Sequence, residues 1–320
     1  MDRERFDDTG CAFRVLLHVV ESSSEDQKVT ALCFGLALAA LSLPGADAAQ
    51  LPGKPDSFKF AVIGDTGTGG RAQYEVGARL AGLQKSFPFQ LVLMLGDNLY
   101  GGQKPKDFHA KFELPYAGLL ESGVKFYAVL GNHDSPRQQS YEPFHMEGRS
   151  YYTFQPAANV RVFALDSNRL DRTQIAWIEK ELAQSDSPWK IVFFHHPLYS
   201  SSARHGSSLD LRAVLEPLFV KYGVAVVFAG HDHVYERIKP QKGITCFVVG
   251  NSSKVRLGNV RRSALTAKAF DRDNAFALLE IDGDTLHFRA VSRTGETVDE
   301  GSILRPAINA SSSRLTPAVP

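Results

Sequence analysis

Five short clusters of carboxylate, amide and imidazole side chains are the parts of this sequence that could do chemistry. Side chains of these types ligate hard and borderline metal ions. One such cluster alone is more often a tight turn or a structural histidine, but five in one chain predict a metal site. The clusters are Gly64-Asp65-Thr66-Gly67, Gly96-Asp97-Asn98, Gly131-Asn132-His133-Asp134, His195-His196-Pro197 and Gly230-His231-Asp232-His233.

Each cluster directly follows a short apolar run that is typical of a buried strand. The runs cover residues 58–63, 91–95, 126–130, 191–194 and 224–229. In open α/β sheets, ligands bind outside the carboxyl ends of the strands. We therefore expect the five strand ends to lie side by side and to gather the five clusters in one crevice.

Two helices and a later group of strands complete the predicted fold. Residues 73–83 and 173–183 look helical, the second stretch with an apolar face. Residues 244–249, 275–281 and 285–291 look like shorter strands, the last two joined by a hairpin turn at Asp282-Gly283. We expect this later part to form the second sheet of a layered sandwich.

In this order, the five clusters resemble the motifs of the purple acid phosphatases, a group within the calcineurin-like metallophosphoesterases. The second motif continues to Tyr100, and the fourth includes Val192 three residues before His195. The versions in this chain look most similar to those of the small tartrate-resistant enzymes of mammalian type, and the match runs from about residue 57 to residue 250. The resemblance implies an α/β fold, a layered αββα sandwich of two mixed sheets flanked by helices.

The resemblance also implies a ligand set for two metal ions. Asp65, Tyr100 and His233 would hold one ion, Asn132, His195 and His231 would hold the other, and Asp97 would bridge both. Two anionic ligands and a share of a third suit Fe(III) at the first position, whereas amide and imidazole ligands suit a divalent ion at the second: Fe, Zn or Mn. Many calcineurin-like enzymes carry a histidine where this chain has Gly67, and Tyr100 would supply the missing ligand. The alternative is that Tyr100 only packs and that the site holds one metal.

Further residues are candidates for contact with a substrate. The resemblance places His133 beside the metals, where it would bind phosphate or protonate the leaving alkoxide, and Asp134 could orient it. His205 resembles a substrate-side histidine of the tartrate-resistant enzymes, or it is a surface residue. Weaker candidates for lining the pocket are Arg204, His145 and Tyr235.

Two polar residues inside the motifs are not expected to be ligands. Successive residues of a strand point to opposite faces, so only one of the neighbours His195 and His196 should enter the site. The Val-x-x-His spacing of the resemblance selects His195 and leaves His196 to support the ligands or to pack within the fold. Asp232 lies between two expected ligands and should point away from them.

The predicted function is two-metal hydrolysis of phosphate monoesters, as in acid phosphatases, with a metal-bound hydroxide attacking phosphorus in line with the leaving oxygen. One alternative is a phosphodiesterase or nucleotide-cleaving enzyme of the same superfamily. Another is a non-catalytic protein that binds phosphate ligands on the same fold, and a third is a membrane-tethered phosphatase. The expected partner is a small phosphorylated substrate.

Composition and domain boundaries support a catalytic domain at residues 57–304. Lys and Arg total 36 and Asp and Glu total 35, so no strong charge favours nucleic acid as a partner. Residues 49–56 form a predicted linker, and residues 305–320 are expected to be a disordered tail.

The N-terminal 48 residues are interpreted as a polar leader and a secretory signal. An apolar run over residues 29–43 precedes Ala46-Asp47-Ala48, an A-x-A pattern that predicts cleavage after Ala48. The chain would then be exported, periplasmic or secreted, without stable membrane association after cleavage. The alternatives are an uncleaved anchor or a start codon placed too far upstream.

Overall fold

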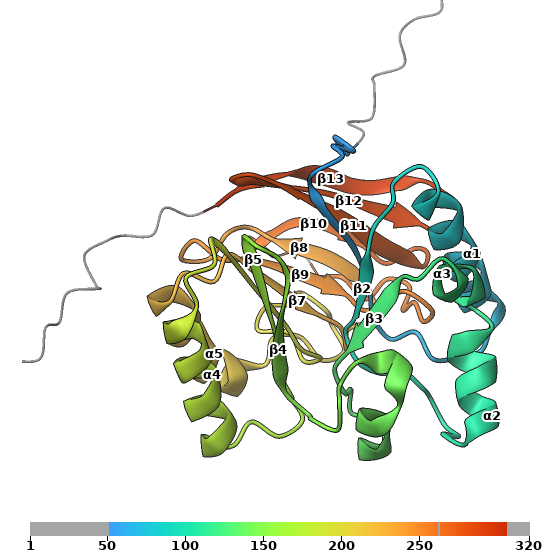
Figure 1. Ribbon diagram of the computed structural model, residues 1–320, viewed down its shortest axis with the longest axis horizontal. Helices are drawn as coiled ribbons and strands as arrows, with labels where there is room; N and C mark the ends of the chain where they lie inside the picture. The colour runs from blue at the N-terminus through green and yellow to red at the C-terminus, as the bar shows by residue number, and fades with distance from the viewer. Residues whose placement is uncertain (1–50, 262, 306–320) are drawn as a thin grey trace, which may run out of the picture. The chain divides into compact units, whose positions relative to one another are not determined.

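The computed structural model describes residues 51–261 and 263–305, which are built around two β-sheets (Figure 1). The expected leader and signal lie outside the described residues, as do residues 306–320 of the expected tail. Arg305, the first residue of that tail, is described, and its backbone N–H donates to the carbonyl of Asp284 at 2.9 Å. None of the helices in the two described ranges combines the length and the apolar character that crossing a lipid bilayer requires.

The first sheet has six strands within the described ranges, in the order β13-β12-β11-β1-β2-β3. Its parallel half is β1 (Phe58–Ile63), β2 (Leu91–Met94) and β3 (Lys125–Ala128), with β3 at the edge. Three antiparallel strands extend it beyond β1: β11 (Ala275–Asp282), β12 (Thr285–Ser292) and β13 (Thr297–Leu304). The sheet is therefore mixed, with β1 between a parallel and an antiparallel neighbour.

The second sheet has seven strands among the described residues, in the order β10-β8-β9-β7-β6-β5-β4. They are β4 (Tyr152–Ala157), β5 (Val160–Ala164), β6 (Trp189–Phe193), β7 (Val226–Ala229), β8 (Tyr235–Ile238), β9 (Thr245–Val249) and β10 (Thr266–Phe270). The inner strands β5, β6, β7 and β9 run parallel to one another, and the outer pairings are antiparallel. This sheet is mixed as well.

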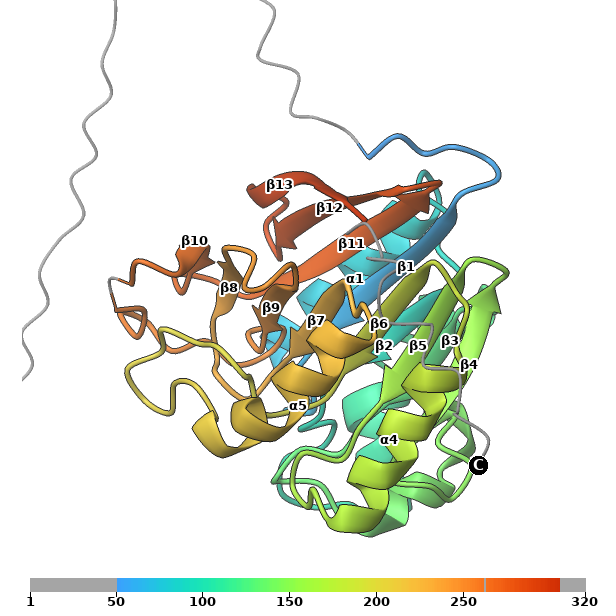
Figure 2. The ribbon, with the colours of Figure 1, turned by 90° about the vertical axis from the view of Figure 1, so that its left-hand side faces the viewer.

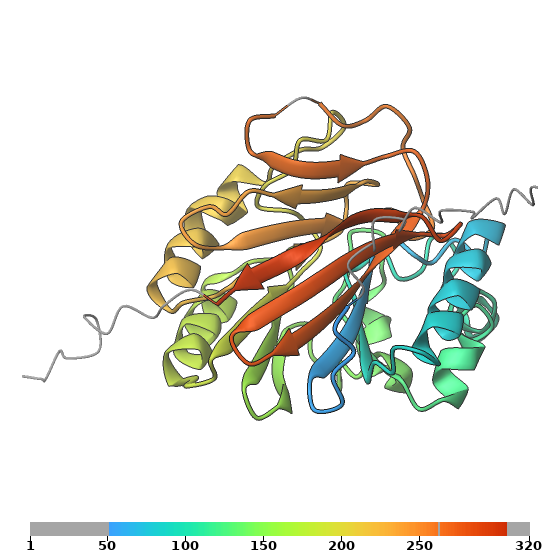
Figure 3. The same ribbon diagram turned by 90° about the horizontal axis from the view of Figure 1, so that it is seen from above.

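Helices cover the outer faces of the two sheets (Figures 2 and 3). On the side of the second sheet lie α4 (Arg172–Gln184) and α5 (Leu209–Lys221). On the side of the first sheet lie α1 (Arg71–Gln84), α2 (Pro105–Phe108) and α3 (Ala117–Glu121). A π-helical turn at His109–Glu113 and 3-10 turns at Pro136–Ser140 and Glu142–Phe144 complete this side. The layers confirm the predicted αββα sandwich.

Both faces of the central strands are apolar because each strand packs against two layers. In β6, Ile191 and Phe193 belong to the core between the sheets, whereas Val192 belongs to the core under α4 and α5. Across the gap between the sheets, the ring of Phe60 in β1 meets the ring of Phe228 in β7 at 6.1 Å. In β6 and β7 the period of two thus divides the side chains between the two cores.

Two expectations about strand pairing are wrong. The five expected strand ends do not belong to one sheet, because β1, β2 and β3 lie in the first sheet and β6 and β7 in the second. The later strands do not form a sheet of their own either: β9 pairs with β7, while β11 and β12 extend the sheet of β1. Apolar runs identify strands, but long-range packing decides which strands become neighbours.

Candidate metal centre

The loops that follow β1, β2, β3, β6 and β7 meet where the two sheets come together. Backbone hydrogen bonds tie the loops to one another: Asp65 N–H donates to the Gly96 carbonyl at 3.0 Å, and Gly230 N–H donates to the His195 carbonyl at 2.9 Å. Gly131 lies against Asp97 so closely that a β-carbon would stand 2.2 Å from the Asp97 amide nitrogen. Only glycine permits this approach, so the motif glycines are packing requirements of the crevice.

One group of predicted ligands gathers around Tyr100. Its hydroxyl donates to Oδ1 of Asp65 at 3.0 Å and lies 3.3 Å from Nε2 of His233. Nε2 of His233 is 3.4 Å from the same Asp65 oxygen. The side-chain ligand atoms of Asp65, Asp97 and His233 all lie within 4.8 Å of one another. The structure therefore brings together the residues predicted for the first ion.

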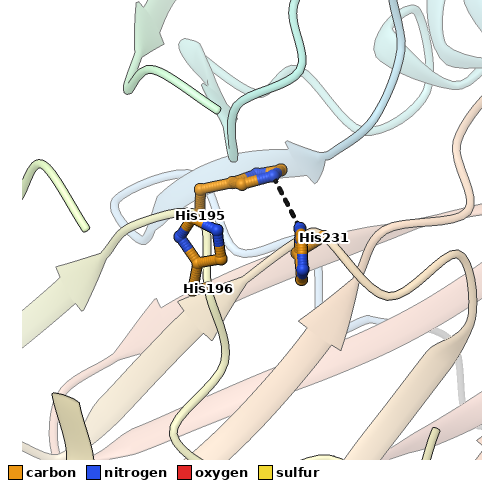
Figure 4. Close-up of side chains that lie close together, drawn as sticks. All are labelled: His195, His196 and His231. Carbon is orange, nitrogen blue, oxygen red and sulfur yellow. Dashed lines mark hydrogen bonds between the residues drawn. The ribbon is translucent and has the colours of Figure 1, made fainter. Parts of the chain in front are cut away.

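The second group gathers around the amide oxygen of Asn132. This Oδ1 atom lies 3.0 Å from Nε2 of His195 and 3.0 Å from Nδ1 of His231, and those two nitrogens are 3.2 Å apart (Figure 4). Nδ1–H of His195 donates to the Leu95 carbonyl at 2.8 Å, which leaves the lone pair of Nε2 directed at the group. Oδ1 of Asp97 is 3.5 Å from that Nε2 atom. Asp97 thus contacts both groups, and ligation itself stays a prediction.

The electrostatics of this donor set fit positive ions. Asp65 and Asp97 are 0% and 1% exposed, and burial together with Asp97 raises the pKa of Asp65 well above its usual range. Burial and the surrounding imidazoles lower the pKa of His231 to about 2, so its ring is neutral and offers a lone pair. Burial and the two carboxylates hold the pKa of Tyr100 far above its ordinary value. A cation placed among these groups reverses that preference and favours carboxylate and phenolate.

Three of the predicted ligands have strained backbone. Asp65, Asp97 and His231 have φ angles of 55°, 52° and 70°, in the left-handed region that non-glycine residues rarely adopt. Each costs on the order of 1 kcal/mol or more, and such strain clusters at functional sites. The strained positions are thus residues whose side chains meet in the crevice.

Asp134 does not orient His133 as expected. Its carboxylate accepts hydrogen bonds from the backbone amides of Asn98, Leu99 and Gly131 at 2.8–3.0 Å and from the Gln138 side chain at 2.8 Å. Two carboxylate oxygens have about four acceptor positions, so these donors fill them. Asp134 instead joins the loop after β2 to the loop after β3, and burial raises its pKa to about 6.

His133 is held at the predicted place by other contacts. Its backbone N–H donates to Oδ1 of Asp97 at 3.0 Å, and its ring packs on the ring of Tyr100 at 5.0 Å. The residue is exposed. It can therefore reach a substrate that approaches the two groups.

His205 lies beside the second group. Its ring centroid is 4.2 Å from that of His231, and the residue is exposed, as is its neighbour Arg204. The buried carboxylate of Asp232 holds this loop, because its Oδ2 accepts hydrogen bonds from the Ser200 hydroxyl at 2.6 Å and the Gly206 amide at 3.2 Å. Asp232 thus points away from the predicted ligands, toward the loop that carries His205.

Two weaker candidates lie away from the crevice. Tyr235 is fully buried, and its hydroxyl donates to Asp299 at 2.8 Å. His145 has Nδ1 at 2.8 Å from the Phe126 carbonyl, and its ring packs on Tyr127 at 4.9 Å. Neither contact involves the predicted ligands, so both residues serve the packing of the fold.

His196 contradicts the expectation that only one residue of the histidine pair enters the site. β6 ends at Phe193, so the alternation of strand side chains does not extend to the histidine pair. The His196 ring lies 4.9 Å from the ring of His195 and 4.4 Å from that of His231 (Figure 4). All three rings share the crevice.

Two further strand ends contribute residues that the sequence analysis missed. After β9, Nζ of Lys254 lies 3.4 Å from the centroid of the Tyr100 ring, and the Arg256 amide donates to the His233 carbonyl at 3.1 Å. After β5, Ser167 contacts both residues of the histidine pair. The signal was present, because Gly250-Asn251 and Asp166-Ser167-Asn168 are polar clusters after apolar runs.

Comparisons with known proteins agree with this geometry. Rabbit (Oryctolagus cuniculus) tartrate-resistant acid phosphatase type 5 is 28% identical over 234 residues, covering 60% of this chain and 72% of its own length. Fe(3+)-Zn(2+) purple acid phosphatase 12 of Arabidopsis thaliana is 29% identical over 60% of this chain and 46% of its own. The structure of purple acid phosphatase PPD1 from yellow lupin superposes with a TM-score of 0.67 at 19% identity, covering 84% of this chain and 58% of that one, which supports the fold.

A family model decides the assignment. The model of the calcineurin-like phosphoesterases matches residues 58–235, more than half of the chain. The matched span contains every predicted metal ligand. The chain is therefore a hydrolytic enzyme of the calcineurin-like phosphoesterase family, as the resemblance predicted.

Proposed function

We propose that this enzyme hydrolyses phosphate monoesters, in the manner of an acid phosphatase, at a centre of Fe(III) and one divalent ion. The observation that carries the proposal is the pair of donor groups that share Asp97. Neighbouring ligand atoms within the groups are 3.0–3.5 Å apart, and the ligand atoms of Asp97 lie within 4.8 Å of those of Asp65 and His233. The name of the Arabidopsis relative, which specifies Fe(3+) and Zn(2+), supports the choice of ions for this chain. When bound, two such ions neutralise charge on the phosphoryl group and acidify water.

The protein's own residues divide the remaining work. Asp65 and Tyr100 supply anionic ligand atoms on one side of Asp97, and Asn132 supplies a neutral oxygen on the other. His133, exposed beside Tyr100, donates a proton or a hydrogen bond to the leaving oxygen. His205 faces the same opening from the loop after β6 and contacts the phosphate.

The ester substrate has room next to the centre. A cavity of about 780 Å³ adjoins it, lined by Asn132 and His196 among others. Clefts of 300–1,000 Å³ hold small ligands, so a small phosphorylated metabolite fits. We also propose that the chain is exported, which the A-x-A pattern at residues 46–48 supports and which sequencing of the mature N-terminus tests.

The visible absorption spectrum of the oxidised, metal-loaded protein tests the centre directly. A phenolate on Fe(III) gives a broad charge-transfer band, so we expect the wild-type protein to be coloured and Tyr100→Phe to be colourless. Tyr74→Phe is the matched control, because Tyr74 bonds to the Ala110 carbonyl away from the centre. A colourless wild-type enzyme that cleaves phosphate esters would contradict the iron assignment, and faster cleavage of diesters than of monoesters would contradict the substrate class.

A further inference from the structure

His196 is a third histidine in the crevice, and the predicted donor set gives it no task. A ring nitrogen of His196 lies within 4.8 Å of ring nitrogens of His195 and His231. Figure 4 shows the three rings facing a common space. Three roles are open to the residue: another ligand, a contact for the substrate, or a packing residue. Its hydrogen bonds and its place at the cavity select among them.

Ser167 determines which nitrogen of His196 carries the proton. The Ser167 Oγ atom accepts hydrogen bonds from the backbone N–H groups of His195 at 3.2 Å and His196 at 3.0 Å. Because a hydroxyl oxygen has two lone pairs, these donors leave Ser167 only its own hydrogen to give. That hydrogen is donated to Nδ1 of His196, which lies 2.9 Å away. Nδ1 is consequently an acceptor, and Nε2 bears the hydrogen.

This tautomer excludes His196 from metal binding. A nitrogen that carries a hydrogen has no lone pair to offer an ion, and the other nitrogen is already bonded to Ser167. The Nε2–H group of His196 is therefore a hydrogen-bond donor with a fixed orientation. It points toward the ring of His231 (Figure 4).

His196 lies where its N–H group can reach a bound phosphate. His196 and Asn132 both line the 780 Å³ cavity, so the ring stands between the metal-ligand groups and the space that adjoins them. The cavity wall beyond the ring carries Asp166, Arg169 and Asp210. A phosphate held at the centre would place its oxygens beside the ring and its alcohol part in the cavity.

We propose that His196 binds the substrate, with its Nε2–H donating a hydrogen bond to a non-bridging oxygen of the phosphate while the alcohol part occupies the adjoining cavity. The inference rests on the proposed phosphatase activity and adds a phosphate-binding residue to it. Ser167 is a positioning residue, because it acts by fixing the tautomer of His196.

Two polar substitutions at His196 test the role of the Nε2–H group apart from that of the rest of the side chain. The amide of glutamine reaches about as far as Nε2 of histidine, whereas the amide of asparagine reaches only as far as Nδ1. We expect His196→Gln to keep the inhibition constant for inorganic phosphate within about threefold of wild type. His196→Asn should raise that constant and KM roughly ten- to a hundredfold, since it loses a hydrogen bond to a charged group. The value of kcat should change little in both variants, because the bound ester and the transition state lose the same contact.

Three outcomes would overturn the inference. The first is a phosphate inhibition constant and KM in His196→Asn equal to those of wild type. The second is loss of a metal ion or a shift of the visible band in either variant, which would make His196 a ligand. The third is a defect that grows with the pKa of the leaving alcohol, which would place the contact on the leaving oxygen. A wild-type chain that hydrolyses no phosphate ester would instead sink the proposed function, so the two failures are distinguishable.

The role of Ser167 has its own measurement. Nitrogen-15 spectra of the full chain loaded with zinc, a diamagnetic ion, distinguish the two tautomers of His196. We expect a single Nε2–H form in wild type and in Ser167→Thr, and a mixture with Nδ1–H in Ser167→Ala. A pure Nε2–H form in Ser167→Ala, or an Nδ1–H form in wild type, would contradict the assignment.

Discussion

Asp97 is the residue on which the proposed pairing of ions depends. Its carboxylate is almost completely buried and contacts the imidazole of His195 in one group, while its ligand atoms lie within 4.8 Å of those of Asp65 and His233 in the other. Its backbone is also strained, with φ at 52°. No other predicted ligand is shared between the two groups.

We expect Asp97→Asn to remove the coupling between the two metal positions. The amide keeps the shape of the side chain but loses the negative charge that two cations would share. Turnover should fall by more than about a hundredfold, because even partners of metal ligands cost ten- to a hundredfold when changed. Metal analysis should show fewer than two ions per chain. Asp56→Asn, in the exposed segment before β1, is the control. A paired metal centre with full activity in Asp97→Asn would contradict the proposal.

At the scale of the elements, the centre depends on hydrogen bonds between loops. Asp134 receives three backbone amides from the loops after β2 and β3, and Asp232 receives the Ser200 hydroxyl and the Gly206 amide from the loop after β6. These two carboxylates lie close to predicted ligands in the sequence, yet they accept hydrogen bonds from the loops and do not point at the predicted metal positions. The third and fifth motifs thus each supply a predicted ligand and also a carboxylate that holds neighbouring loops together.

Asp134→Asn should loosen the brace between the loops after β2 and β3. The amide group of asparagine has one acceptor atom, so at least one backbone N–H would face another N–H instead of an oxygen. Leaving a buried donor unsatisfied costs roughly 1–3 kcal/mol. We expect a loss of this size in the free energy of unfolding by denaturant, together with weaker retention of metal during dialysis. Unchanged stability and metal content would show that Asp134 is no brace.

Short-range sequence patterns predicted most of the helices and strands, but they predicted little about which strands pair with one another. β1 begins and ends as expected, and α1 and α4 lie within two residues of their predicted bounds, because apolar periodicity is local information. The division of the strand ends between two sheets was not predictable, since Phe60 meets Phe228 only in the folded chain. The same limit explains the error at His196, where a rule for strands was applied beyond the end of β6.

On the scale of the whole molecule, the metal-free chain should lose stability in acid. Burial lowers the pKa of His233 to about 4 and that of His231 to about 2, below the ordinary value of 6.5. At these two rings the unfolded chain therefore binds more protons than the folded chain below pH 6.5, and their contribution to stability falls as the pH falls. The raised pKa values of Asp65 and Asp134 act in the opposite direction. At pH 5 the loss is up to about 2 kcal/mol per ring before solvent screening.

Denaturant unfolding of the metal-free protein at pH 7.5 and pH 5 tests this expectation. Metal-loaded protein is the comparison, because bound ions compete with protons for the same ring nitrogens. We expect the midpoint of the metal-free protein to fall more between the two pH values than that of the loaded protein. Equal falls, or greater stability of the metal-free protein at pH 5, would contradict the buried neutral state of the two rings.

The pairing of β1 with β11 has a consequence for a chain that lengthens from its N-terminus during synthesis. The last predicted ligand, His233, is made well before β11, which completes the sheet around β1 at residues 275–282. A nascent chain thus contains every predicted ligand before it contains the strand that completes the pairing of β1. Strand pairing across such a sequence distance also forms slowly. We therefore expect metal to bind at the complete centre only after β11 has been synthesised and has paired with β1.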